Sequence, residues 1–90
     1  MTTGKNPAIR EILLQVVENQ ISSLDPPETK ETYDRLLSEG YSEDETRSFL
    51  AAAILFEINT MMRKMEPFNR QRFVARLHGL PDSLELEEDD

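Results

Sequence analysis

The chain has 90 residues, which suits one small domain, and it contains no cysteine. Disulfides, thiolate chemistry and cysteine-bound zinc are therefore excluded. The formal net charge of −8 is uneven, because residues 82–90 carry six acidic residues and no basic one, which leaves −2 for the rest. No apolar run approaches the roughly 20 residues of a membrane span, and the first residues lack a signal-peptide pattern. We therefore expect a cytoplasmic protein with no membrane contact.

The first predicted helix begins after Asn6, a good N-cap residue. Pro7 fits the first helical position because its missing N–H would have no partner there. Apolar residues then recur at helical spacing and predict one buried face, which Gln20 shares. The apolar members of this face are Ile9, Ile12, Leu13, Val16, Val17 and Ile21.

A second helix is predicted to open at Pro26, with Asp25 as its N-cap and Glu28 at the spacing of a capping box. It is expected to end at Gly40, since glycine takes the left-handed conformation without steric cost. Its apolar stripe is narrow and consists of Tyr33, Leu36 and Leu37.

The third predicted helix follows almost at once. Ser42 caps it and Glu45 completes a capping box, and nothing strongly breaks the pattern until about Met65. The connection between the second and third helices is so short that the two should pack against each other as a helical hairpin.

The last predicted helix comes after Pro67, which ends the long third helix. Asn69 can cap this last helix, which runs to about His78. No strand alternation is evident. The sequence therefore predicts an all-α fold: a compact four-helix domain over residues 1–81 with a long central third helix. Residues 82–90 are expected to form a flexible acidic tail, because like charges repel.

The middle of the third helix is apolar on two sides, which is typical of a central helix covered all round. Phe49 and Phe56 lie seven residues apart on the side opposite the main stripe, with Ala52 near them. The main stripe consists of Leu50, Ile54, Ile58, Met61 and Met65, and Ala51, Leu55 and Met62 widen it. Only three short helices are available to cover both sides, so the second side is either ordinary core or a contact surface for another chain. Methionines suit adaptable binding surfaces as well as irregular cores. The candidate interface residues are Phe49, Ala52, Phe56, Met61, Met62 and Met65.

Glu57 lies beside the main apolar stripe of the same helix. Lone carboxylates are seldom fully buried unless they are paired. One interpretation turns the carboxylate outward to solvent or to a base. Another makes Glu57 a buried polar contact across a helix interface, with Gln20 as the candidate partner or with a second subunit. A catalytic acid is the third.

Motifs that carry chemistry are missing. His78 is the only histidine, so no nucleophile and base can be paired, and neither a GxxxxGK[ST] nor a GxGxxG motif occurs. The Glu-x-x-His spacing of carboxylate-bridged metal sites is also absent. We therefore expect no enzyme activity, no catalytic residue, no metal and no cofactor.

Basic residues cluster in the C-terminal third of the chain. A basic helix surface can follow phosphates, although no aromatic residue is evidently placed to stack on bases. An alternative function is thus a nucleic-acid-associated regulator, with Arg70, Arg72 and Arg76 as phosphate contacts.

Three stretches carry a resemblance: NPAIREILLQVVENQ, DPPETKETYDRLLSEGYSEDE and EPFNRQRFVARLHGLP. Together, from about Asn6 to Pro81, they resemble short bacterial helical proteins and the C-terminal part of a bacterial family of unknown function, the eighteen-forty-one family. That family carries two histidines four residues apart in the first matching helix, where this chain has Arg10 and Leu14, so a metal site does not carry over. The resemblance implies an all-helical bacterial protein and no particular activity. The matching residues are Glu18, Gln20, Gly40 and Tyr41.

The sequence as a whole predicts a non-enzymatic interaction module that forms a homodimer or binds another protein through its third helix. Besides the nucleic-acid regulator, a small enzyme or enzyme subunit is the other alternative. A ligand-sized pocket lined by Gln20, Tyr33 and Glu57 would support that last option.

Overall fold

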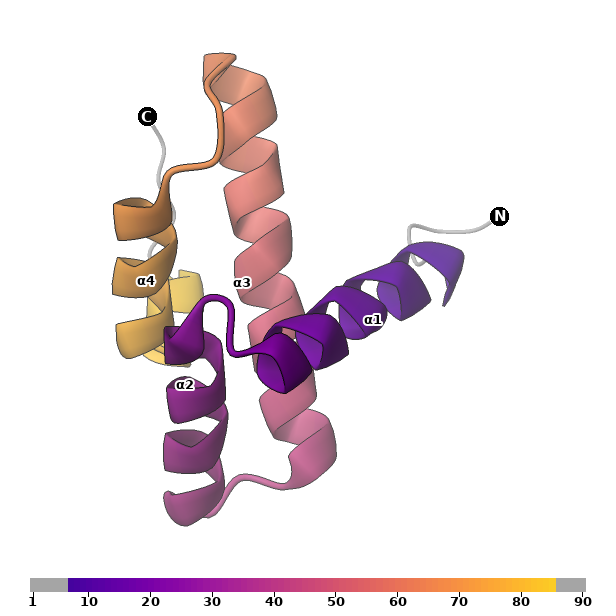
Figure 1. Cartoon of the computed structure of the whole chain (residues 1–90), viewed down its shortest axis with the longest axis vertical. Helices are drawn as coiled ribbons and strands as arrows, with labels where there is room; N and C mark the ends of the chain where they lie inside the picture. The colour runs from indigo at the N-terminus through magenta and orange to yellow at the C-terminus, as the bar shows by residue number, and fades with distance from the viewer. Residues whose placement is uncertain (1–6, 86–90) are drawn as a thin grey trace.

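The computed structural model describes residues 7–85, which form four α-helices and a short 3-10 helix (Figure 1). No strand occurs in this part of the chain, so the predicted all-α class is confirmed, and the third helix is the longest as expected. No helix within it is long and apolar enough to cross a membrane. The elements are α1 (Pro7–Ser23), α2 (Pro27–Ser38), α3 (Glu43–Lys64), α4 (Arg70–His78) and η1 (Asp82–Glu85).

Local capping side chains fix the starts of α3 and α4. The Ser42 hydroxyl accepts a hydrogen bond from the Glu45 N–H at 3.0 Å, and the Glu45 carboxylate accepts one from the Ser42 N–H at 2.9 Å. The Asn69 side chain accepts one from the Arg72 N–H at 2.9 Å. Both predicted caps are confirmed, because each depends only on residues three positions apart.

The start of α2 differs from the prediction. Pro26 is the N-cap rather than Asp25, it makes no side-chain cap hydrogen bond, and the helix begins at Pro27. A residue that precedes a proline disfavours helical geometry, and Pro26 accordingly has an extended backbone (φ −80°, ψ 152°). Asp25 therefore lies one position too early to cap. The predicted cap of α1, Asn6, lies outside the described residues.

The core lies where α3 contacts the other helices. Val17, Leu36, Leu50 and Leu77 are fully buried there, one from each of the four α-helices. Such burial is the main source of stability in a domain of this size.

α1 crosses α3, and its N-terminal half projects beyond the body of the domain (Figure 1). Ile9 and Ile12 were predicted for the buried face of this helix. They are instead 49% and 62% exposed, because they lie on the projecting half.

The short helix α4 is held at its C-terminal end by a side chain from α2. The Arg35 guanidinium donates hydrogen bonds to the carbonyls of Leu77 and Leu80, both at 3.1 Å. The last carbonyls of a helix have no partner within it, so this arginine supplies one from 42 residues away in the sequence.

The folded part continues past the boundary predicted at Pro81. Residues 82–85 form η1, and Ser83 is buried. The Ser83 hydroxyl donates a hydrogen bond to the Arg76 carbonyl, and the Arg76 guanidinium donates one to the Ser83 carbonyl, each at 2.7 Å. The remainder of the predicted tail, residues 86–90, lies outside the described residues.

Candidate interaction surface

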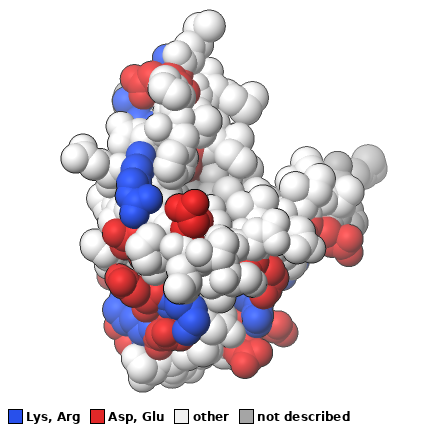
Figure 2. All heavy atoms as spheres, viewed as in Figure 1, with Lys and Arg blue, Asp and Glu red and all other residues white. Residues whose placement is uncertain are grey.

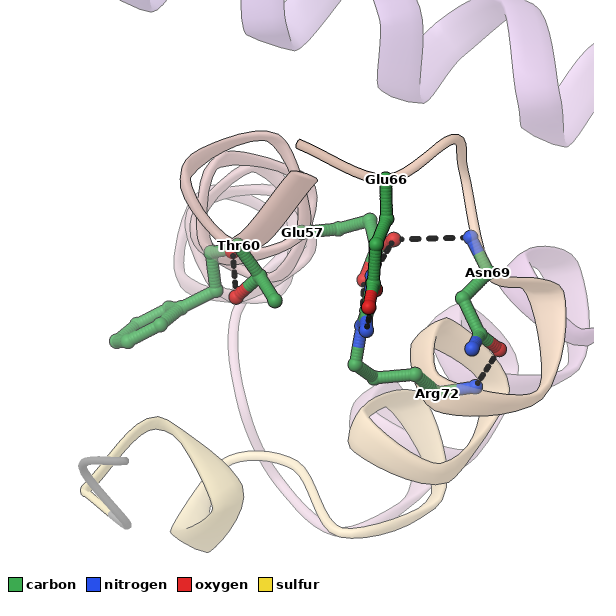
Figure 3. Close-up of polar contacts among 6 residues, drawn as sticks. Glu57, Thr60, Glu66, Asn69 and Arg72 are labelled. Atoms are coloured by element: carbon green, nitrogen blue, oxygen red, sulfur yellow. Dashed lines mark hydrogen bonds and ion pairs between the residues drawn. The ribbon is translucent and has the colours of Figure 1, made fainter. Parts of the chain in front are cut away.

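Glu57 is buried inside the domain and paired with an arginine of α4 (Figure 3). One carboxylate oxygen accepts a hydrogen bond from Arg72 Nε at 2.9 Å. The other accepts from Arg72 Nη2 at 2.9 Å and from the Asn69 N–H at 3.0 Å. This is the two-pronged geometry of a strong charge-assisted pair. It joins the middle of α3 to the first turn of α4.

The electrostatics of the pair favour its charged form. Removal from water opposes ionisation of Glu57 and is the largest single influence on it. The hydrogen bonds from Arg72 and Asn69, together with the positive charges of Arg72 and Arg76, outweigh burial and lower the pKa of the Glu57 carboxyl. The hydrogen bond to Glu57 likewise raises the pKa of the Arg72 guanidinium, and a second one to Glu66, at 3.2 Å, adds to it.

Gln20, the partner expected for Glu57, makes a different contact. Its side-chain oxygen accepts a hydrogen bond from the Thr29 hydroxyl at 2.7 Å, which ties the end of α1 to α2. Gln20 and Glu57 do line one pocket of about 120 Å³, together with Ile54, Ile58, Met61, Phe68 and Phe73.

This pocket lacks the features of a small-molecule site. Ligand pockets are usually about 300–1,000 Å³, and this one is well below that range. Tyr33 does not line it, because the Tyr33 ring lies under the Arg47 guanidinium, 5.3 Å from its centroid. In the described part of the chain, no group of three or more histidine, aspartate or glutamate side chains could hold a metal ion.

The phenylalanines predicted for an interface are packed within the domain. The Phe49 ring meets the Tyr41 ring edge to face at 5.2 Å, and the Phe56 ring lies 4.5 Å from the guanidinium of Arg76. Both rings are half-buried, as is Ala52 between them. The second apolar side of α3 is therefore covered in large part by the chain's own residues, including those of α4.

The three arginines predicted as phosphate contacts are also engaged. Arg70 pairs with Glu28 at 3.0 Å, Arg72 holds Glu57, and Arg76 covers Phe56. They face three different partners rather than one common surface.

The exposed apolar surface of α3 lies on another side, along its C-terminal half. Leu55, Ile58, Met62 and Met65 are 39%, 38%, 71% and 90% exposed. Of the predicted interface residues, Met62 and Met65 belong to this surface, whereas Met61 lines the 120 Å³ pocket. Leu55 and Ile58 were predicted for the main apolar stripe of this helix and not for an interface, although their spacing to the two methionines is helical.

The projecting half of α1 faces this side of α3. Gln20 lines a pocket with Ile58 and Met61, so its side of α1 points toward the C-terminal half of α3. Ile9, Ile12 and Val16 share that side, because they precede Gln20 at helical spacing.

Two apolar helix sides thus meet at an angle, which we call the apolar corner: Ile9 and Ile12 of α1 with Leu55, Ile58 and Met62 of α3. Figure 2 shows that charged side chains gather over α2 and the start of α3, whereas the angle between α1 and the C-terminal half of α3 is largely uncoloured. A surface of this kind is typical of a protein contact site.

No family model, curated protein or solved structure matches this chain. The resemblance to the eighteen-forty-one family therefore stays a prediction.

Proposed function

We propose that this protein is a cytoplasmic, non-enzymatic interaction module that associates with a second copy of itself through the apolar corner. The observation that supports this most is the exposure of five large apolar side chains on two helix sides that face one another. Single exposed apolar residues are ordinary, but a contiguous set free of charge is typical of a surface that another protein covers.

The shape of the chain favours a second copy over an unrelated partner. The C-terminal half of α3 protrudes from the domain and has one apolar side (Figure 1). The angle that it forms with α1 is largely free of charged side chains in the space-filling view (Figure 2). One molecule therefore carries both complementary parts. A two-fold dimer uses the same patch on both subunits, so each copy would cover the other.

The energy of burial supports a reversible dimer. Burying a whole Leu, Ile or Met side chain contributes about 1.5–3 kcal/mol. The side chains of the corner are 38–71% exposed, so each would gain about 1 kcal/mol on complete burial. Ten of them from two copies contribute on the order of 10 kcal/mol, against an association cost of roughly 4–15 kcal/mol. At the lower end of that cost, about 6 kcal/mol remains, which corresponds to a dissociation constant of roughly tens of micromolar.

Light scattering after size exclusion tests the proposal. The wild-type chain is expected to change from twice 10.4 kDa toward 10.4 kDa as it is diluted. Met62→Glu places a charge on an exposed corner position and should give a folded monomer at every concentration, because a buried unpaired carboxylate is costly. Gln71→Glu is the matched control, since it adds the same charge at an exposed position on α4.

Two results would count against the proposal. One is a wild-type monomer at millimolar concentration. The other is a dimer that Met62→Glu leaves intact. Excess absorbance at 260 nm that high salt removes would instead favour the nucleic-acid alternative.

A further inference from the structure

The geometry points to one arrangement of the two copies: the C-terminal halves of their α3 helices pack antiparallel about a two-fold axis, and the tip of each α3 enters the apolar corner of the other copy. This inference rests on the proposed self-association and specifies its direction and register.

The first argument is the spacing of the exposed residues on α3. Leu55, Ile58, Met62 and Met65 follow one another at intervals of three, four and three residues. This is the repeat with which two helices at a shallow crossing angle interdigitate. These four residues, which we call the α3 seam, contain no charge and extend over about 15 Å at 1.5 Å per residue.

The second argument is that α1 covers the same side of α3 one turn earlier. Ala51, four residues before Leu55, is buried. Arg47 and Ser48 flank Ala51 on that side. Arg47 is ion-paired with Glu18 of α1, and Ser48 accepts a hydrogen bond from Arg10 of α1 at 3.2 Å. This side of α3 is therefore exposed to a partner only from Leu55 onward, beyond the place where α1 crosses it.

This placement of α1 sets the direction of the pair. In a parallel pair, the two α1 helices would lie at the same level and hold the α3 helices apart. An antiparallel pair puts them at opposite ends.

The register follows from the two-fold symmetry. The four seam residues all face one another only if the axis passes α3 midway between Ile58 and Met62. Ile58 then meets the partner's Met62, and Leu55 meets the partner's Met65. Met65 is the C-cap of α3 in the left-handed conformation and is 90% exposed, so the seam ends at the tip of the helix. The tip then reaches the level of Leu55, one turn beyond the place where α1 crosses α3.

Because the chain has no cysteine, engineered cysteines can test this register directly. Full-length Ile58→Cys and Met62→Cys are mixed in equal amounts under mild oxidation, above the dissociation constant found by light scattering. A disulfide requires Cα atoms about 4.4–6.8 Å apart, so only facing positions link efficiently. The mixture should form the mixed 58–62 disulfide faster than either variant links alone.

The expected size of the effect follows from effective concentration. Facing cysteines react as though present at millimolar concentration, so at ~0.1 mM protein linkage should be about tenfold faster than by random collision. Glu31→Cys mixed with Asp34→Cys on the exposed side of α2 provides that collision rate. Leu55→Cys mixed with Met65→Cys repeats the test at the ends of the same register.

The outcomes separate the inference from the proposed function. A dimer mass with both seam mixtures well above the α2 control supports both. A dimer mass with seam mixtures that link no faster than the α2 control, or with Ile58→Cys linking fastest to itself, overturns the arrangement and leaves self-association standing. A wild-type monomer at all concentrations, with seam and control rates equal, overturns both.

Discussion

The ion pair between Glu57 and Arg72 gives the sharpest prediction about stability. The Glu57 side chain is 5% exposed and that of Arg72 is 23% exposed. Removing one partner of a buried pair costs about 3–5 kcal/mol, because the other is left uncompensated. In Glu57→Gln, Arg72 stays partly exposed to solvent and keeps its ion pair with Glu66, so the lower end of this range applies. We therefore expect Glu57→Gln to lower the free energy of unfolding by about 3 kcal/mol.

Thermal unfolding followed by circular dichroism measures this loss. In a domain of this length, 1 kcal/mol shifts the melting temperature by roughly 4–8 °C, so Glu57→Gln should melt about 12–24 °C lower. Urea unfolding gives the free energy independently. The matched control is Glu66→Gln, which removes the other carboxylate on Arg72. Glu66 is 46% exposed, and such a pair contributes at most about 1 kcal/mol.

The same pair predicts a pH dependence. The folded protein lowers the pKa of Glu57 below its unfolded value of about 4.3, so the unfolded state binds the proton more readily. The stabilisation is therefore fully present above pH 4.3 and is lost as the pH falls through the folded pKa. Wild type and Glu57→Gln should differ most near neutral pH and converge in acid.

Two results would refute this reasoning. In the first, Glu57→Gln is no more destabilising than Glu66→Gln. In the second, the difference between Glu57→Gln and wild type stays constant from pH 7 down to pH 3, about one unit below the unfolded value. Either result would mean that the energy of burial cancels that of pairing.

Three further variants test individual contacts by urea unfolding. Gly40→Ala should lower the free energy of unfolding by about 1–2 kcal/mol, because Gly40 has φ +103°, which alanine rarely adopts. An added Cβ would meet no atom within 4 Å, so a steric clash would not contribute, and an unchanged urea midpoint would refute backbone strain as the cause. Ser42→Ala should cost about 1 kcal/mol through loss of the capping box, whereas Ser42→Asp, which keeps an acceptor, should not. Arg35→Lys should cost about 1–2 kcal/mol and speed amide exchange in α4, since an ammonium group does not reproduce the paired contacts to Leu77 and Leu80; equal exchange rates would contradict this.

The sequence predicts those features of the fold that depend on neighbours in the chain. The capping box at Ser42 is complete within four residues, so its pattern is sufficient. The predicted start of α2 is wrong, although it also depends only on neighbouring residues. Pro26 and Pro27 both suit the first helical position, but Pro26 precedes a proline and therefore has an extended backbone, so the helix begins at Pro27.

Features that depend on how helices cross could not be predicted in this way. The partner of Glu57 lies 15 residues away on another helix, and no periodicity relates the two. The exposure of Ile12 depends on where α1 crosses α3. Helical spacing predicts which side of a helix is apolar, but it does not predict how many turns of that side a neighbouring helix covers.

Both ends of α4 are held by side chains from other helices, and this has a consequence for the order of folding. With nine residues, α4 is shorter than the roughly 12–15 residues that an isolated helix needs in water. We therefore expect it to form only when Arg35 and Glu57 are already in place to bind its two ends. Until then, Glu57 keeps its hydration shell on the open flank of α3. The docking of α4 is thus also the step that dehydrates this carboxylate and pairs its negative charge with Arg72, so α4 should be the last helix to join the domain and the first to leave it.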